Sequence, residues 1–138
     1  MNIRIGTDND KRIILEKYPY TSQVIGQGGT LIVAFEDEDM IGFLWNFRRL
    51  ISPLIDEMEE FINVIEVFDE KNRCKGIGSL LVNKCIDIAR DNGSYQVRAY
   101  CDVNNVSSHK LWIKNKFAVS PVKMEDGQIV GSYVTYVI

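Results

Sequence analysis

Residues 69–93 read DEKNRCKGIGSLLVNKCIDIARDNG, and this stretch decides how the rest of the chain is interpreted. The cations Arg73 and Lys75 stand just before Gly76-Ile77-Gly78, where a helical pattern begins. Its apolar positions are Leu80, Leu81, Cys85, Ile86 and Ile88, and Asn92-Gly93 ends it. The first N–H groups of a helix have no intrahelical acceptor, and glycines let a ligand approach the backbone. The loop therefore predicts a phosphate or pyrophosphate site.

Strand and helix patterns alternate on both sides of this stretch. The segment FINVIEVF, residues 61–68, predicts a buried central strand, because valine and isoleucine lie on both of its faces. A helix is predicted after Asp8 or Asp10, either of which would cap it, and another after Asn104 or Asn105. Further strands are predicted at residues 2–5, 31–35, 40–47, 95–103, 117–124 and 127–138. The expected order is β-α-(α)-β-β-β-α-β-α-β-β, a mixed α/β fold in which the helix in brackets is a short one around residues 21–27.

Residues 48–60, RRLISPLIDEMEE, are predicted to be a connection between strands. They contain Pro53 and a cluster of acids, and both features are typical of irregular, solvated segments. The acids are Asp56, Glu57, Glu59 and Glu60. We interpret them as a solvated acidic loop or as a surface that steers a cationic ligand, as Asp102 would also do.

Several phosphate-binding loops place glycines before a helix, and so does a helix start that binds nothing. The P-loop requires G-x-x-x-x-G-K-[ST], which this sequence lacks. The Rossmann fingerprint requires a third glycine where Leu81 stands, and a tight turn after the strand. The remaining pattern, Arg/Gln-x-x-Gly-x-Gly/Ala after a strand, is matched by Arg73, Gly76 and Gly78. In these residues the sequence resembles the pyrophosphate loop of the GNAT N-acetyltransferase superfamily.

A second motif supports the same resemblance. Family members often carry Asn-x-x-Ala-x-x-Leu-Tyr-x-x-x-Gly-Phe after the next strand, and NVSSHKLWIKNKF follows that spacing. The matching positions are Asn105, Ser108, Leu111, Trp112 and Phe117. The resemblance implies a single GNAT-like domain over residues 1–138. It also implies a central, mostly antiparallel mixed sheet, with splayed fourth and fifth strands and flanking helices.

The resemblance further implies that acetyl-CoA is the acyl donor. In the family the pantetheine arm lies between the fourth and fifth strands, which implies backbone contacts from Val67 and Phe68. Asn105 would bond to that arm and Ser108 would line the cofactor, although Asn105 would equally serve as a helix cap. The pyrophosphate would be held by the Arg73 side chain and by the amides of Cys74, Lys75, Gly76, Ile77, Gly78 and Ser79.

The family's reaction is a direct attack of an amine on the thioester, assisted by a base and an acid. Trp112 stands where the family's acidic tyrosine is usual, and an indole N–H is not a useful acid. We expect Trp112 to pack in the core, while Lys116 replaces the usual glycine. The candidate catalytic residues are Glu66 as base and Tyr100 as acid. The alternatives are that Glu66 faces a basic partner or the sheet edge, and that Tyr100 is structural.

The composition is that of an ordinary globular domain, with 46% hydrophobic and 25% charged residues in 138. Nineteen acids against sixteen bases give a net charge of −3, which argues against a nucleic-acid partner. No apolar run approaches the roughly 20 residues that span a membrane. The first residues do not resemble a signal peptide, so a cytoplasmic location is expected. Cys74, Cys85 and Cys101 have no C-x-x-C spacing, which predicts neither a metal site nor a disulfide framework.

The sequence thus predicts an acetyl-CoA-dependent N-acetyltransferase acting on a primary amine of a small molecule or peptide. A second hypothesis, motivated by Trp112, is a CoA-binding regulatory or interaction module without turnover. A third is a nucleotide-binding domain with affinity for ATP or NAD. Because family members often dimerise, the final strand SYVTYVI is a candidate for pairing between two subunits. Candidates to line the acceptor site are Tyr20, Trp45, Phe47, Arg48 and Arg49.

Overall fold

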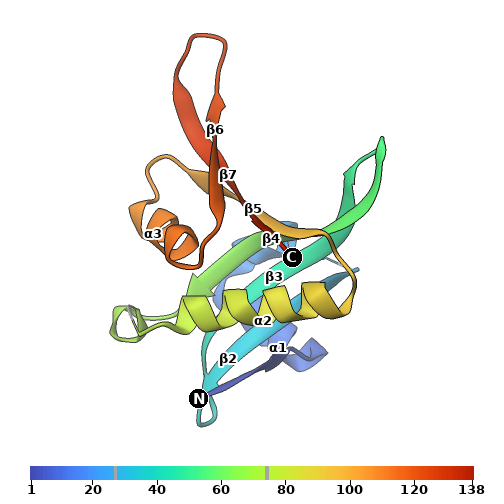
Figure 1. Cartoon of the computed structure of the whole chain (residues 1–138). Coiled ribbons are helices and arrows are strands. Elements are labelled where there is room, and N and C mark those ends of the chain that lie inside the picture. Colours follow the sequence, from blue (N-terminus) through green and yellow to red (C-terminus); the bar gives the residue numbers. More distant parts are fainter. Residues whose placement is uncertain (27, 74) are drawn as a thin grey trace.

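A seven-stranded sheet organises the chain in the computed structural model, which describes residues 1–26, 28–73 and 75–138 (Figure 1). The strands are β1 (Asn2–Ile5), β2 (Gly29–Glu36), β3 (Asp39–Ser52), β4 (Ile55–Val67), β5 (Gln96–Asp102), β6 (Ala118–Lys123) and β7 (Ile129–Val137). They lie in the order β1-β2-β3-β4-β5-β7-β6. All neighbours are antiparallel except β4 and β5, which are parallel. The predicted mixed, mostly antiparallel sheet is confirmed.

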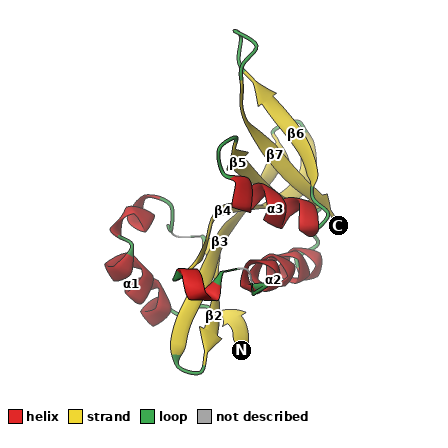
Figure 2. Ribbon diagram, turned by 90° about the vertical axis from the view of Figure 1, so that its left-hand side faces the viewer, coloured by secondary structure: helices red, strands yellow, loops and turns green. Residues whose placement is uncertain are grey.

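Helices cover both faces of this sheet. The α-helices are α1 (Asp8–Lys17), α2 (Ile77–Asp91) and α3 (Val106–Lys114), and two short 3₁₀ helices are η1 (Pro19–Gln23) and η2 (Glu70–Asn72). Figure 2 shows α1 on one side of the sheet and α2 and α3 on the other. The predicted order of elements is confirmed. Among the described residues, no helix is long and apolar enough to cross a membrane.

The stripe of α2 that packs on the sheet has helical periodicity. Its buried residues are Ile77, Leu81, Val82, Cys85, Ile86 and Ala89. They join Ile32, Leu44 and Ile62 of the sheet in one core cluster. On the other face, Ile14 of α1 packs with a second cluster that contains Phe43 and Phe68. Leu80 is 45% exposed, because it lies outside this stripe.

The start of α1 differs from the prediction. Thr7, not Asp8 or Asp10, is the N-cap, and its hydroxyl accepts a hydrogen bond from the Asp10 N–H. The Asp10 carboxylate in turn accepts a hydrogen bond from the Thr7 N–H at 2.8 Å, which completes a capping box. The same carboxylate pairs with Arg4 at 2.6 Å. Asp10 thus stabilises the first turn from within the helix.

The prediction of a connection at residues 48–60 is wrong. β3 continues to Ser52 and β4 begins at Ile55, so this stretch forms a hairpin with Pro53 in its turn. Pro53 has no N–H to pair, and at a turn none is needed. The acidic cluster is divided by strand geometry: Asp56 and Glu57 are exposed, whereas Glu59 and Glu60 are 0% and 2% exposed. Two of the four acids are therefore buried in the sheet and not part of a solvated loop.

Candidate functional site

The parallel pair β4 and β5 separates partway along its length. Register pairs join the two strands only from Glu59–Gln96 to Ile62–Ala99. Beyond this point β4 follows β3 as far as Val67, and β5 follows β7 as far as Asp102. Asn63 is left as an extra residue at a register shift between β4 and β3, and such a bulge bends its strand. The predicted splay of the fourth and fifth strands is confirmed, and we call this gap the opening.

The backbone groups that line the opening follow from the pairing of β4 with β3. The Phe68 N–H donates to the Ile41 carbonyl at 2.8 Å, so it is directed toward β3. Residues of an antiparallel strand alternate in direction, which turns the N–H and C=O groups of Ile65 and Val67 toward the opening. The Phe68 carbonyl accepts from the Asn72 side chain at 3.0 Å. Of the two residues predicted to contact the pantetheine arm, the Val67 backbone faces the opening and the Phe68 N–H faces β3; Ile65, which was not predicted, also faces the opening.

The N-terminus of α2 stands beyond the end of β4. Gly76 is its N-cap, with a φ of 80° that favours glycine, and open space surrounds the position that a Cβ would occupy. No side chain among the described residues caps this helix end. The first intrahelical bond runs from the Leu80 N–H to the Gly76 carbonyl, so the amides before Leu80 have no helical acceptor. Arg73 and Lys75 are exposed beside them, and Cys74 lies outside the described residues.

Gly78 has a packing role that the sequence did not indicate. A Cβ at this position would lie 3.2 Å from Leu111 Cδ1, which is tighter than ordinary contact. The glycine therefore lets α2 approach α3. Ser79, one residue on, accepts a hydrogen bond from the Asn115 side chain at 3.0 Å, which ties the same two helices together.

The residues predicted from the second motif lie at the start of α3. The Asn105 side chain accepts from the Ser108 N–H at 3.1 Å, so it caps the helix, as the alternative interpretation proposed. Ser108 Oγ in turn accepts from Trp112 Nε1 at 2.9 Å. Trp112 is 2% exposed and packs 4.9 Å from Phe117, ring centre to ring centre. The predicted core packing of Trp112 is confirmed.

Lys116→Gly is expected to raise the free energy of unfolding by about 1 kcal/mol. Lys116 follows α3 with a φ of 66°, a left-handed conformation that disfavours any residue with a Cβ. The Phe117 N–H donates to the Trp112 carbonyl at 3.0 Å at the end of the helix. This hydrogen bond does not involve the Lys116 side chain, so the conformation of the helix end should persist in the variant. Urea unfolding measures the change. Lys110→Gly, the same substitution at an exposed position inside α3, is the control and should lower stability by about 1 kcal/mol. Equal losses in both variants would contradict the expectation.

Glu66 and Tyr20 form a pair at the edge of the opening. Glu66 is on β4 and is in register with Phe43, so its side chain is on the face covered by α1. η1 reaches the same place because Tyr18, just before it, stacks on Phe68 at 5.1 Å. Tyr20 then donates its hydroxyl to Glu66 Oε1 at 3.0 Å. Burial, the Glu66 charge and this hydrogen bond raise the pKa of Tyr20 to about 12, so its hydroxyl stays protonated near neutral pH.

Tyr100 is the other predicted catalytic residue, and its ring is directed away from β4. Its hydroxyl lies over Gly131 of β7, where an added Cβ would be 2.3 Å from it. The ring also packs against Tyr133 at 5.4 Å. Desolvation and the nearby Asp102 raise the pKa of Tyr100 above its ordinary value. Tyr100 and Glu66 share one face of the sheet, but the structure pairs Glu66 with Tyr20.

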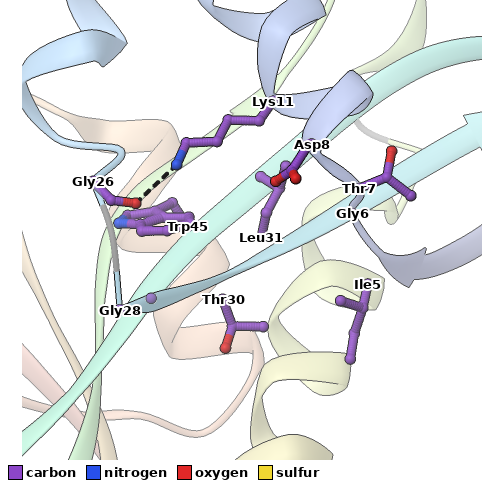
Figure 3. A pocket seen from close by; sticks show the side chains of 11 residues that line it. Ile5, Gly6, Thr7, Asp8, Lys11, Gly26, Gly28, Thr30, Leu31 and Trp45 are labelled. Carbon is purple, nitrogen blue, oxygen red and sulfur yellow. Dashed lines mark hydrogen bonds between the residues drawn. The ribbon is translucent and has the colours of Figure 1, made fainter.

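A separate hollow of about 420 Å³ lies between the start of α1, the loop before β2, and Trp45 (Figure 3). Lys11 Nζ donates to the Gly26 carbonyl at 2.9 Å and lies 5.4 Å from the Trp45 ring centre. The hollow is lined by none of the residues predicted for the cofactor or for catalysis. Its lining does include Trp45, one of the residues predicted to line the acceptor site.

Two of the three cysteines are described, and both Cys85 and Cys101 are buried free thiols. Burial raises the pKa of Cys85, so it is an unreactive part of the core. Over residues 1–26, 28–73 and 75–138, no group of three or more His, Cys, Asp or Glu is placed to hold a metal ion.

Comparison with known protein families assigns the chain to a family. Residues 7–117 match the model described as the acetyltransferase (GNAT) family. The chain belongs to the GNAT family. Those residues include both motifs, the opening and Glu66, so the family assignment covers the whole candidate site. A search of curated proteins returns no match.

Solved structures show the same GNAT fold at low sequence identity. An IAA acetyltransferase from Bacillus cereus aligns with a TM-score of 0.75 and 19% identity, over 99% of each chain. NAA60 of Arabidopsis thaliana, solved with acetyl-CoA, aligns with a TM-score of 0.74 and 15% identity, over 99% of this chain and 98% of that one. The ribosomal-protein-S18-alanine N-acetyltransferase of Escherichia coli gives 0.74 and 14%, over 99% and 93%.

Proposed function

We propose that this GNAT protein is an N-acetyltransferase that transfers an acetyl group from acetyl-CoA to a primary amine of a small molecule or peptide. The observation that carries the proposal is the uncapped N-terminus of α2, flanked by Arg73 and Lys75, beyond the end of an opened strand pair. Glu66 stands at the edge of that opening. Three neighbours of the same fold are named as acetyltransferases or solved with acetyl-CoA, which supports the proposal.

The described residues fit this cofactor. Gly76 leaves open space in front of unpaired helix amides, which suits the two phosphates of a pyrophosphate. The backbone N–H and C=O groups of Ile65 and Val67 face the opening. They can form hydrogen bonds with the amides of a pantetheine arm, as a neighbouring β-strand would. We propose that the pyrophosphate is held by Arg73, Lys75, Gly76, Ile77, Gly78 and Ser79, with Cys74 as a further prediction. Asn105 keeps its side-chain NH₂ for the arm while its oxygen caps α3, and Ser108 lies one turn beyond.

Acetyl-CoA, when bound, supplies an acetyl thioester that an amine attacks directly. Only an uncharged amine is a nucleophile, so the site needs a proton acceptor near neutral pH. Glu66 is the proposed acceptor, and Tyr20 orients it by donating a hydrogen bond at 3.0 Å. Backbone N–H groups at Ile65 and Val67 are placed to stabilise negative charge that develops on a carbonyl oxygen in the opening. Tyr100 remains the candidate acid, although its hydroxyl lies over Gly131 of β7.

A CoA-binding module without turnover is the second candidate function. It is favoured by Trp112, whose indole is buried and bonded to Ser108 at a position where the family usually has an acidic tyrosine. Both candidates bind CoA, and only the first releases CoA thiol when an amine is added. Measurement of thiol release with a panel of primary amines therefore separates them.

Arg73→Glu combined with Lys75→Glu is expected to weaken acetyl-CoA binding by about 100-fold or more, because two charge-assisted contacts to phosphate are replaced by repulsion. Isothermal titration calorimetry with acetyl-CoA, CoA, ATP and NAD measures it. Both residues are exposed, so the fold should be unaffected. The control is Arg12→Glu with Lys123→Glu, which makes the same change in net charge at exposed positions on α1 and β6. Binding of ATP or NAD without CoA affinity in the wild type would contradict the proposed function.

A further inference from the structure

The sheet face that bears Glu66 continues past α1 onto β5 and β7. On β5, Val97, Ala99 and Cys101 belong to the core under α2, so the alternate residues are on the opposite face with Glu66. These alternate residues are Gln96, Arg98, Tyr100 and Asp102. Their exposure shows that this part of the face is open: the Arg98 side chain is 24% exposed and Tyr133 of β7 is 38% exposed. We call this surface the open face.

One end of the open face carries excess positive charge. Arg49 Nε and Arg98 Nη2 donate to the same oxygen of Glu59 at 2.9 and 2.8 Å, and Gln96 donates to the other oxygen at 2.8 Å. Two guanidinium groups therefore share one carboxylate, which leaves a local charge of +1. Arg98 donates to described residues through Nη2 alone, and its Nε is buried without a partner among them, so Nη1 is the group of Arg98 that remains for a ligand. Its side chain and that of Arg49, which is 39% exposed, retain donors for a further anion.

Aromatic rings form the middle of the open face. Phe61, in register with Arg98, lies under the Arg49 guanidinium at 4.1 Å and within 5.8 Å of that of Arg98. Arg98 also lies 4.9 Å from the centre of the Tyr133 ring. Stacking on rings fixes the guanidinium planes and weakens their hydration, which favours recognition of a planar carboxylate.

The other end of the open face is acidic and meets the opening. Asp102 is four residues beyond Arg98 on β5, which is about 13 Å at the rise of a strand. Glu66 is five residues beyond Phe61 on β4, and the bulge at Asn63 makes the distance along the strand similar. An ammonium group is favoured at this end and a carboxylate at the other. Each charged group of a ligand would contact the protein at roughly 3 Å. The ammonium and carboxylate groups of that ligand would therefore be on the order of 7–10 Å apart.

We propose that the acceptor is a primary amine that also carries a carboxylate, about 7–10 Å from its nitrogen. The carboxylate binds Arg98 and Arg49, and the amine lies at Glu66. An α-amino acid is excluded, because its two charged groups are on one carbon and do not span the open face. An ω-amino acid or a peptide with an acidic residue after its first residue has the required spacing. This inference rests on the proposed acetyl transfer.

The test compares matched amines in the acetyl-transfer assay with the wild-type protein. We expect kcat/KM for 6-aminohexanoate to exceed that for hexylamine by about tenfold or more, with 3-aminopropanoate no better than hexylamine. The alternative that the acceptor is a peptide is tested with the C-terminal amides of Ala-Glu-Ala and Ala-Gln-Ala. A preference for the acidic tripeptide alone assigns the site to peptides, and a preference for 6-aminohexanoate alone assigns it to small molecules. Equal rates within both pairs would overturn the inference and leave acetyl transfer itself intact.

Arg98→Gln tests the residue directly. It should remove the preference for 6-aminohexanoate over hexylamine, a fall of about tenfold or more in the ratio of the two kcat/KM values. Arg90→Gln on α2, whose side chain is 53% exposed, is the control. Glu59 keeps Arg49 and Gln96 in this variant, and thermal unfolding checks the fold. A preference that persists in Arg98→Gln would overturn the assignment.

Should no amine be acetylated, the proposed reaction fails, and calorimetric binding of 6-aminohexanoate decides the inference separately. Binding that is lost in Arg98→Gln and absent for hexylamine supports the open face as a ligand site. Failure of the wild type to bind 6-aminohexanoate and the acidic tripeptide overturns it.

Discussion

Glu66→Gln is expected to lower kcat for acetyl transfer by about 100- to 10,000-fold, the range associated with loss of a positioned general base. The amide oxygen of glutamine still accepts the Tyr20 hydrogen bond, which is 3.0 Å long in the wild type, so the local structure should persist. Without a base, only amine that is already deprotonated reacts. The residual rate should therefore increase with pH up to the pKa of the acceptor, near 10.4 for a lysine-like amine.

Steady-state kinetics between about pH 6 and 10 measures this effect, and acetyl-CoA affinity should stay within about twofold, because Glu66 is not among the residues proposed to hold the cofactor. The control is Glu57→Gln, an exposed glutamate on the same strand. A kcat within about threefold of the wild type would assign proton removal to another group.

Glu59→Gln is expected to lower the free energy of unfolding by about 3 kcal/mol or more. Glu59 is completely buried and accepts hydrogen bonds from Arg49, Arg98 and Gln96. A neutral glutamine leaves two arginines without their counter-charge. It also places an NH₂ group where only donors surround it, and such unsatisfied buried groups are costly.

The contribution of Glu59 to the free energy of unfolding should also depend on pH. Burial alone would raise the pKa of Glu59, but the hydrogen bonds from Arg98, Gln96 and Arg49 outweigh it and hold the pKa below the ordinary value. A lowered pKa in the folded state contributes stability that is present above the unfolded pKa of about 4.3. That contribution is lost as the pH falls through the lower, folded-state pKa.

Urea unfolding of the wild type and Glu59→Gln at several pH values checks both statements. The difference between the two proteins should be largest near neutral pH and should shrink below about pH 4. Glu57→Gln, at an exposed site two residues earlier, should change stability by no more than about 0.5 kcal/mol. A difference between wild type and Glu59→Gln that is constant down to about pH 2 would show that the ionised carboxylate is not its cause.

The residues proposed for catalysis and for acceptor recognition lie on either side of one backbone irregularity. The bulge at Asn63 separates β4 from β5, and the separation frees the backbone of Ile65 and Val67. Where the two strands still pair, before the bulge, Glu59 and Phe61 join Arg98 across the interface. The bulge thus divides the strand pair into a packed half that carries the open face and a separated half that carries the opening.

Features that depend on neighbours in sequence could be predicted. The buried stripe of α2 follows from residues three and four apart, and the start of that helix follows from Gly76. The order of strands and helices and the family motif were likewise local. The turn chemistry was less informative: Pro53 indicated a loop, whereas it occupies only the turn of a hairpin. Thr7 is the cap of α1, although the acids that follow it, Asp8 and Asp10, belong to a residue type that is at least as common at this position.

The sequence by itself determined the order of elements, the glycine loop and the family, because each depends on propensities and spacings within a few residues. Tertiary structure alone decided which acids are buried and which side chains they pair with. Tyr20 and Glu66 are 46 residues apart and Glu59 and Arg98 are 39 apart, and they meet only because strand register and η1 bring them together. Register sets the face of every side chain, so the burial of Glu59 and the position of Glu66 became visible only once the strands were paired.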